Sequence, residues 1–298
     1  MDVRRTLLVD AFADDPLAGN AAGVVPDADG LEAEQMQAVA RELNASETAF
    51  LTGDDDADRR IRYFTPAQEV PLCGHATIAS LAHLDGEGEL DGEGTLRTNV
   101  GVIDVSVDDG VAWMEQDDPE VETVDLDYDR AGEALGIDPA ALRDVGADLP
   151  AAYATTGLPF LVIPVNFLEH LGGADPDMDA VASLATEYDA TGVYAFTFDA
   201  LDRDSTLHAR MFAPGAGVPE DPVTGTASGA CGAYLREVDA FDDDFPEEMR
   251  FEQGHFVDRP GVVRVRVGDR VEVGGRAVTA LDGSLAVPST DDDDILEA

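Results

Sequence analysis

Two stretches that lie far apart in the chain follow one pattern, and this repeat constrains the fold more than any other feature. Residues 62–84 read RYFTPAQEVPLCGHATIASLAHL, and residues 210–235 read RMFAPGAGVPEDPVTGTASGACGAYL. Each has Arg, an apolar residue, Phe, a small residue and Pro, then a loop, then Gly-x-Ala opening a run of small residues that ends in Leu. The pattern predicts a strand–loop–helix unit in each copy, and hence an internally duplicated chain. The alternative is a chance likeness of two strand-to-helix loops.

The length of the chain agrees with two domains. At 298 residues, with 44% hydrophobic residues, the chain is long enough and apolar enough for two packed cores. We expect one domain over residues 1–122, completed by 280–298, and a second over 123–279. Periodicity predicts helices at 31–44, 74–84, 177–188 and 225–236, with strand-like segments between them.

The charge of the chain excludes several classes of partner. There are 63 acidic and 18 basic residues, all of the latter arginine, for a formal net charge of −45. Nucleic acids and anionic membranes both need basic patches, so neither is expected as a partner.

The acidic residues are spread along the whole chain, with short clusters at 53–58, 241–245 and 291–294. This predicts a cytoplasmic protein of a high-salt organism, where short screening lengths weaken self-repulsion. A metal-binding carboxylate cluster is the alternative, but no calcium-loop spacing occurs.

Targeting, disulfide and cofactor signals are not found. Cys73 and Cys231 suggest neither a disulfide framework nor a metal site of usual spacing. The apolar run in MDVRRTLLVDAF is too short for a signal peptide, and no run approaches the ~18 residues of a membrane helix. GxSxG, a phosphate loop and GxGxxG do not occur. We therefore expect no cofactor and no metal.

The start of the second repeated helix suggests a site for an anion. Helix N-termini present unpaired N–H groups and a partial positive charge, and the small residues Gly225, Thr226 and Ala227 leave this end open. If the start of the first repeated helix faces the same cleft, a small carboxylate is the natural ligand.

Several residues near these helix starts have side chains that could carry chemistry, each with a plainer alternative. Glu47 lies between a helix and a strand and could move a proton, although most acidic residues here are solvated surface. His75 could bind or transfer a proton, or bond its local backbone. Cys73 could be a thiolate nucleophile or base, or a small packing residue. Asp221 and Thr224 could hold a ligand or cap the helix.

Four ordered blocks between residues 8 and 230 carry a family resemblance: VDAFADDPLAGNAAGVV, LNASETAFL, FTPAQEVPLCGHATIA and EDPVTGTASGA. Together they resemble the PhzF-like (phenazine-biosynthesis-like) isomerase family, related in fold to diaminopimelate epimerase and proline racemase. The resemblance implies an α+β fold of two similar domains. Each would be a curved, mostly antiparallel sheet wrapped around a central helix, with the active site between the domains.

The resemblance also implies an activity, residue roles and assembly. The expected reaction is a cofactor-independent isomerisation with Glu47 as proton shuttle, aided by His75 and Asp221. The residues expected to bind substrate are Asn20, Gly74, Gly225, Thr226, Thr224 and Cys73. The expected assembly is a homodimer.

We therefore expect an isomerase that moves a proton within a small carboxylic acid. A racemase that uses two cysteines fits less well, because Thr224 takes the second helix entrance and Cys231 lies about 10 Å farther along the helix. A racemase that pairs Cys73 with another base, and a binding protein without turnover, stay open as alternatives.

Overall fold

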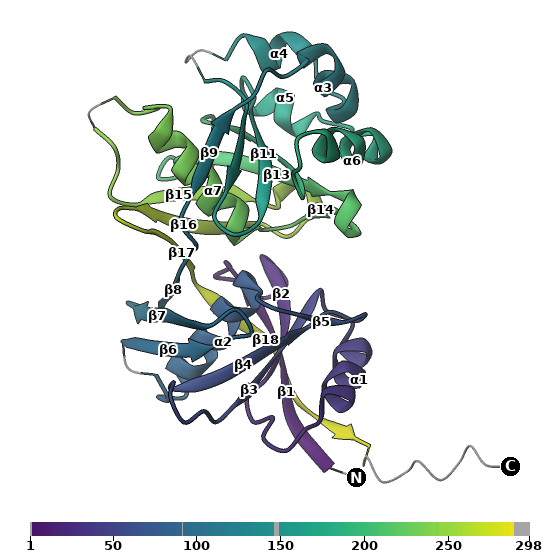
Figure 1. The fold of residues 1–298 in the computed structure, drawn as a ribbon, viewed down its shortest axis with the longest axis vertical. Helices are drawn as coiled ribbons and strands as arrows, with labels where there is room; N and C mark the ends of the chain where they lie inside the picture. The colour runs from purple at the N-terminus through teal and green to yellow at the C-terminus, as the bar shows by residue number, and fades with distance from the viewer. Residues whose placement is uncertain (1, 91, 146–148, 243, 289–298) are drawn as a thin grey trace, which may run out of the picture. The chain divides into compact units, whose positions relative to one another are not determined.

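The computed structural model describes residues 2–90, 92–145, 149–242 and 244–288, and the chain divides into two compact units (Figure 1). Within these ranges the first unit contains residues 2–17, 21–114 and 276–288, and the second contains residues 18–20 and 115–275. The domain boundaries expected from the sequence stay a prediction. The acidic cluster at 291–294 lies outside the described residues.

The first unit is built on a mostly antiparallel sheet. Its strands are β1 (Asp2–Ala11), β2 (Asn20–Val25), β3 (Glu47–Thr52), β4 (Arg59–Phe64), β5 (Glu69–Val70), β6 (Glu93–Arg97), β7 (Val102–Asp108), β8 (Val111–Glu115) and β18 (Ala277–Val287). β1 pairs antiparallel with β18 and also pairs with β2. β2 runs parallel to β3, and β3 antiparallel to β4. β4 pairs antiparallel with β5 and parallel with β6, and β6, β7 and β8 continue antiparallel.

The second unit repeats this order of pairings. Its strands are β9 (Glu120–Thr123), β10 (Ala152–Thr155), β11 (Pro159–Pro164), β12 (Gly192–Thr197), β13 (Leu207–Ala213), β14 (Val218–Asp221), β15 (Met249–Gln253), β16 (Gly261–Val267) and β17 (Val271–Gly275). β10 pairs antiparallel with β9 and β11, β11 runs parallel to β12, and β12 antiparallel to β13. β13 pairs antiparallel with β14 and parallel with β15, and β15, β16 and β17 continue antiparallel. The predicted fold of two similar units is confirmed.

One helix lies at the centre of each unit: α2 (Gly74–Gly86) in the first and α7 (Gly225–Glu237) in the second. α7 contacts β9, β10 and β11 at one end of its sheet and β16 and β17 at the other, so the sheet curves around the helix. α2 likewise contacts β1, β18, β3 and β7. Most residues of both helices are buried. A helix enclosed in this way has small or apolar residues on all its faces, which agrees with the composition that predicted it.

The other helices lie at the periphery of their units. They are α1 (Ala33–Leu43), which joins β2 to β3, and α3 (Tyr128–Leu135), α4 (Pro139–Arg143), α5 (Leu168–Gly172) and α6 (Met178–Glu187) in the second unit. Apolar residues of α3 to α6 form one buried cluster with residues of β11 and β12. The helices predicted at 31–44, 74–84, 177–188 and 225–236 are all confirmed.

The loop in each copy of the repeat contains a short strand that the sequence did not reveal. A forked ion pair ties β4 to β5, with Arg62 Nε 2.8 Å from Glu69 Oε1, and another ties β13 to β14, with Arg210 Nε 2.8 Å from Glu220 Oε1. In both copies the guanidinium also lies over the ring of the Phe two residues farther along. These pairs fix the segment that leads into each central helix.

Close packing around α7 gives a stability prediction. A methyl group added at Gly232 would lie 2.6 Å from Val265 Cγ1 and 3.2 Å from Val267 Cγ2, whereas one added at Gly86 meets nothing within 4 Å. We expect Gly232→Ala to lower the free energy of unfolding by about 1–3 kcal/mol through overpacking. The control Gly86→Ala should be neutral or stabilise by up to about 1 kcal/mol. Urea unfolding of both variants tests this, and equal effects would contradict it.

Candidate active site

The first group of candidate residues lies at the start of α2, and we call Ser46, Glu47, Cys73 and His75 the Glu47 cluster. His75 Nε2 lies 3.4 Å from Glu47 Oε2 and 3.2 Å from Ser46 Oγ. Cys73 Sγ lies 3.5 Å from the other nitrogen of the ring, Nδ1. The side chains of Glu47 and His75 are only 22% and 12% exposed. A carboxylate, an imidazole and a thiol are thus in mutual reach and largely withdrawn from solvent.

The local backbone structure explains why Glu47 and His75 lie close together. α1 ends at Asn44, which adopts the left-handed conformation (φ 52°) that asparagine tolerates better than most residues. The chain then turns directly into β3, of which Glu47 is the first residue, paired in register with Ala22. His75 is the second residue of α2. The carboxylate therefore comes from a strand end and the imidazole from a helix start, as the sequence predicted.

The second group lies at the start of α7, and we call Asn20, Asp221, Thr224 and Gln253 the Asp221 cluster. Asn20 Nδ2 donates to Asp221 Oδ1 and to the Val223 carbonyl, both at 2.9 Å. The Thr224 hydroxyl donates to Asp221 Oδ2. Gln253 Nε2 donates to the Asp221 carbonyl at 2.7 Å, and its Oε1 accepts the Thr224 N–H at 3.2 Å. Three side chains hold this aspartate, and three of the four residues were predicted.

Gln253 and Arg259 are the supporting residues that the sequence did not reveal. Gln253 is 1% exposed and is followed by Gly254, at φ 84°. A methyl group at Gly254 would lie 2.1 Å from the Arg259 carbonyl, so only glycine fits this turn. Arg259 donates to the carbonyls of residues 18 and 19, next to Asn20. The Gln-Gly dipeptide at a strand end is the single local sign of this arrangement.

The first turns of α2 and α7 differ from those of α3, α4 and α6. Side chains of Asp127, Asp138 and Asp177 cap α3, α4 and α6 by accepting first-turn N–H groups. The N-cap residues of α2 and α7, Cys73 and Thr224, form no such bond. Because the first N–H groups of a helix lack partners within the helix, these two ends suit an anionic ligand. Thr224 is therefore not a side-chain cap; its hydroxyl holds Asp221 instead.

The remaining predicted residues lie in the same first turns. Gly74 is half-buried and Gly225 is buried. The Thr226 carbonyl accepts the Thr156 hydroxyl at 3.3 Å. Ser228 bonds the Thr224 carbonyl at 2.9 Å and pairs with the Tyr194 hydroxyl at 3.1 Å, so its hydroxyl is engaged in packing.

Cys231 is remote from the Asp221 cluster. It lies in α7 with no exposed surface, and burial raises the pKa of its thiol well above the usual value. It follows the N-cap Thr224 by seven residues, or about 10 Å of helix. A second cysteine base at the start of α7 is therefore not available.

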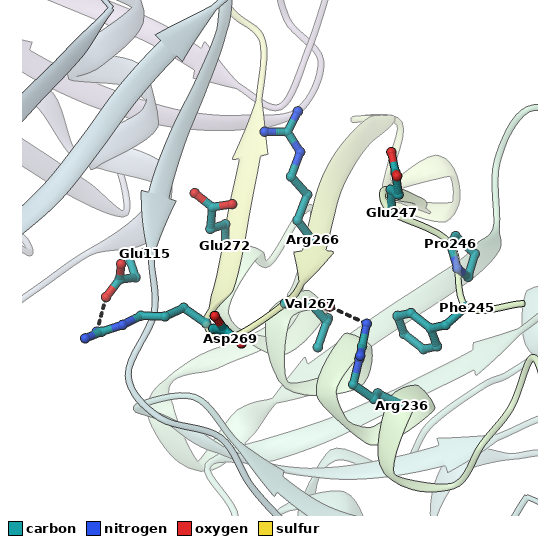
Figure 2. Close-up of a pocket in the computed structure, with 11 residues that line it drawn as sticks. Glu115, Arg236, Phe245, Pro246, Glu247, Arg266, Val267, Asp269 and Glu272 are labelled. Atoms are coloured by element: carbon teal, nitrogen blue, oxygen red, sulfur yellow. Dashed lines mark hydrogen bonds and ion pairs between the residues drawn. The ribbon is translucent and has the colours of Figure 1, made fainter. Parts of the chain in front are cut away.

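A cavity of about 510 Å³ in the second unit lies at the other end of α7 (Figure 2). Arg236, in the last turn of the helix, donates to the Val267 carbonyl and stacks 4.2 Å from the Phe245 ring. Glu115, which also lines the cavity, pairs with Arg270. No predicted site residue lines this cavity. Its arginines are engaged with neighbouring groups, so it presents no proton-transfer constellation like that of the Glu47 cluster.

The fold belongs to a class that includes epimerases and racemases. A hydroxyproline epimerase from Agrobacterium vitis superposes with a TM-score of 0.55 over 95% of this chain and 92% of that chain, at 15% identity. At this identity the likeness shows the fold alone. Among the described residues, no helix has the length and apolar character needed to cross a membrane.

The chain belongs to the phenazine biosynthesis-like (PhzC-PhzF) family, whose model matches residues 9–283. A PhzF-family protein from Bacillus anthracis superposes with a TM-score of 0.86 at 30% identity, covering 96% of this chain and 100% of that chain. The uncharacterized isomerase YfhB of Bacillus subtilis is 34% identical over 97% of this chain and 98% of its own. The trans-2,3-dihydro-3-hydroxyanthranilate isomerase of Pseudomonas aeruginosa is 31% identical over 95% of both chains. The predicted family is confirmed, and the protein is an isomerase-type enzyme.

The bonds of Gln253 give a prediction about the Asp221 cluster. Gln253→Ala removes hydrogen bonds to Asp221 and Thr224 and leaves buried groups unpaired, so we expect a loss of about 2–3 kcal/mol in the free energy of unfolding. Gln116 is also buried, and its side-chain Nε2 donates to the Glu115 carbonyl at 3.4 Å, the one side-chain bond it forms among the described residues. The control Gln116→Ala should cost about 1 kcal/mol or less. Denaturant unfolding measures both, and a loss for Gln253→Ala no larger than the control's would contradict the assigned role.

Proposed function

We propose that the protein is a cofactor-independent isomerase that moves a proton within a small carboxylic acid, with Glu47 as the acid/base. The observation that carries this proposal is the 3.4 Å contact between Glu47 and His75 beside an uncapped helix start. Membership of the family supports an isomerase reaction. The Glu47 cluster supports proton transfer as the step of that reaction, with Glu47 as the acid/base.

In the proposed step, the Glu47 carboxylate removes a proton from a carbon of the substrate and returns it to another carbon. The C–H bonding electrons move into the adjacent unsaturated system of the substrate, and negative charge grows on the oxygens of the substrate carboxyl group. First-turn N–H groups of α2 and α7 stabilise that charge, as preorganised donors do at oxyanion sites. No external oxidant, reductant or cofactor is needed for this balance.

His75 and Asp221 are proposed to bind and polarise the substrate. His75 contacts Glu47 and Ser46 through Nε2, so it can steady the carboxylate in both protonation states. Asp221, held by Asn20 and Thr224, offers a fixed acceptor for a hydroxyl or amino group.

The substrate class follows from the uncapped helix starts and from the relatives. The Pseudomonas aeruginosa relative is named for a dihydro-hydroxyanthranilate, which carries a carboxylate. For this chain we propose a small carboxylic acid of the same general kind, bound by Gly74, Gly225 and Thr226 through their backbone.

A second candidate is an amino-acid racemase that uses Cys73. The contact of 3.5 Å between Cys73 Sγ and His75 Nδ1 favours it, because an adjacent imidazole can take the thiol proton. The two reactions differ in which substitution stops deuterium exchange: Cys73→Ser for the racemase, Glu47→Gln for the isomerase. A binding protein without turnover would raise its melting temperature with a ligand recovered unchanged.

The test of the proposal is Glu47→Gln, which keeps the shape of the side chain and removes its proton chemistry. Turnover should fall about 10²–10⁴-fold, the usual contribution of a positioned acid/base. Incubating a panel of carboxylic acids in D₂O, with product and deuterium content read by NMR, measures it. The control Glu42→Gln, on the exposed surface of α1, should retain full activity. Unchanged turnover in Glu47→Gln would sink the assignment.

We further propose that the protein is cytoplasmic in a high-salt cell, is a homodimer and has no nucleic-acid partner. The proposal of a high-salt cell rests on the formal net charge of −45. The acidic side chains repel one another unless dissolved salt screens their charges.

Screening gives a measurable consequence. As KCl rises from about 0.1 to about 1 M, the Debye length falls from about 10 to about 3 Å, so the melting temperature should rise steeply across this interval. Differential scanning fluorimetry measures it, with sucrose of equal osmolality as the control. A melting temperature that is flat or falling across this interval would contradict adaptation to salt.

A further inference from the structure

A group of metal-ligating side chains lies in the second unit, apart from the candidate active-site residues; we call His208, Glu252 and His255 the His208 cluster. One potential ligand atom from each residue lies within 4.8 Å of the others. His208 is in β13, Glu252 in β15, and His255 in the short 3₁₀ helix η2 (His255–Val257). The parallel register of β13 and β15 places His208 opposite Glu252. The sheet thus brings His208 to two residues that lie 44 and 47 positions farther along the chain.

Glu252 is a buried carboxylate without a cationic side chain. It is 2% exposed, and its two oxygens accept the N–H groups of Leu201 at 2.9 Å and Asp202 at 2.7 Å. Among the described residues, no arginine forms an ion pair with it, although the chain pairs many other carboxylates in this way. Buried charges in proteins are paired or bind metal ions. The two backbone donors orient this carboxylate as outer hydrogen bonds orient a metal ligand.

His208 is a buried imidazole whose hydrogen bonding is incomplete. The residue has no exposed surface, its Nε2 faces His255 Nδ1 at 3.1 Å, and its Nδ1 has no partner among the described residues. Neutral imidazole is the form that binds metals.

We propose that His208, Glu252 and His255 bind one divalent transition-metal ion of the zinc type. Two nitrogens bound at 2.0–2.1 Å with tetrahedral angles lie about 3.3 Å apart, close to the 3.1 Å between the facing nitrogens. Two imidazoles and one carboxylate form a common zinc ligand set, and they leave a fourth position for water. His255 is partly exposed and provides the route of entry.

The site would brace the turn that supports the Asp221 cluster. His255 and Gln253 flank Gly254, and Arg259 follows η2 by two residues. Gln253 and Arg259 hold Thr224 and the backbone beside Asn20. A metal bound at His255 would therefore fix the turn without contacting the substrate. The proposal stands whether or not the isomerase proposal does, because its readout is metal content and stability.

The experiment uses the full chain, stripped with a chelator, dialysed and titrated with Zn²⁺ in about 1 M KCl, which screens weak binding to surface carboxylates. Metal retained after gel filtration is measured by atomic emission, and melting temperature by scanning calorimetry. The wild type should retain about one zinc per chain and melt several degrees higher with it, as ligand linkage requires. His255→Gln should lose both effects, and so should Glu252→Gln.

Two controls locate the ion. His170→Gln alters an exposed histidine of α5 and should keep both effects. Cys73→Ser should also keep both, because the Glu47 cluster is the other group with metal-ligand geometry among the described residues. His255 is partly exposed, so its variant should fold even if a variant of His208 does not, and circular dichroism checks this.

Three outcomes would overturn the proposal. Zinc retention by His255→Gln equal to that of the wild type would place the ion elsewhere. Loss of zinc in Cys73→Ser would place it at the Glu47 cluster. No retained zinc in the wild type would leave the two histidines as a simple hydrogen-bonded pair.

Discussion

The two enclosed helices with uncapped first turns are the feature on which the rest of this structure depends. Strands surround α2 and α7, and the N-cap side chain of neither helix bonds the first-turn N–H groups. Elsewhere aspartates cap peripheral helices of the second unit, so acidic residues suited to this role are plentiful. Omitting them at the two central helices leaves a positive potential in a strongly negative chain. The Glu47 cluster lies at the start of α2, and the Asp221 cluster lies at the start of α7.

The sequence predicted most of the fold because the relevant signals are local. The small-residue runs predicted α2 and α7 to within two residues, and the repeat predicted two similar units, each with a strand–loop–helix segment. Glu47, His75 and Asp221 were found because they directly precede or begin a helix or strand that periodicity identifies. The short strands β5 and β14 were missed, because each is held by an arginine from the preceding strand and not by its own propensity.

Residues whose roles depend on pairing between distant strands could not be predicted. Gln253 reaches Thr224 across 29 positions, and a glutamine in a strand has no local signature. His208 meets Glu252 only because β13 runs parallel to β15 in one register. The sequence led us to expect no metal, since these ligands follow no motif spacing. The proposed zinc site departs from that expectation on geometry alone.

The central claim is that a small carboxylic acid is held by open helix starts while Glu47 moves its proton. The most direct measurement is a crystal structure with such an acid bound. The account predicts that its carboxylate accepts hydrogen bonds from first-turn N–H groups of α2 or α7, with the reacting carbon about 3–3.5 Å from a Glu47 oxygen. A carboxylate bound elsewhere, or a reacting carbon beyond the reach of Glu47, would contradict it.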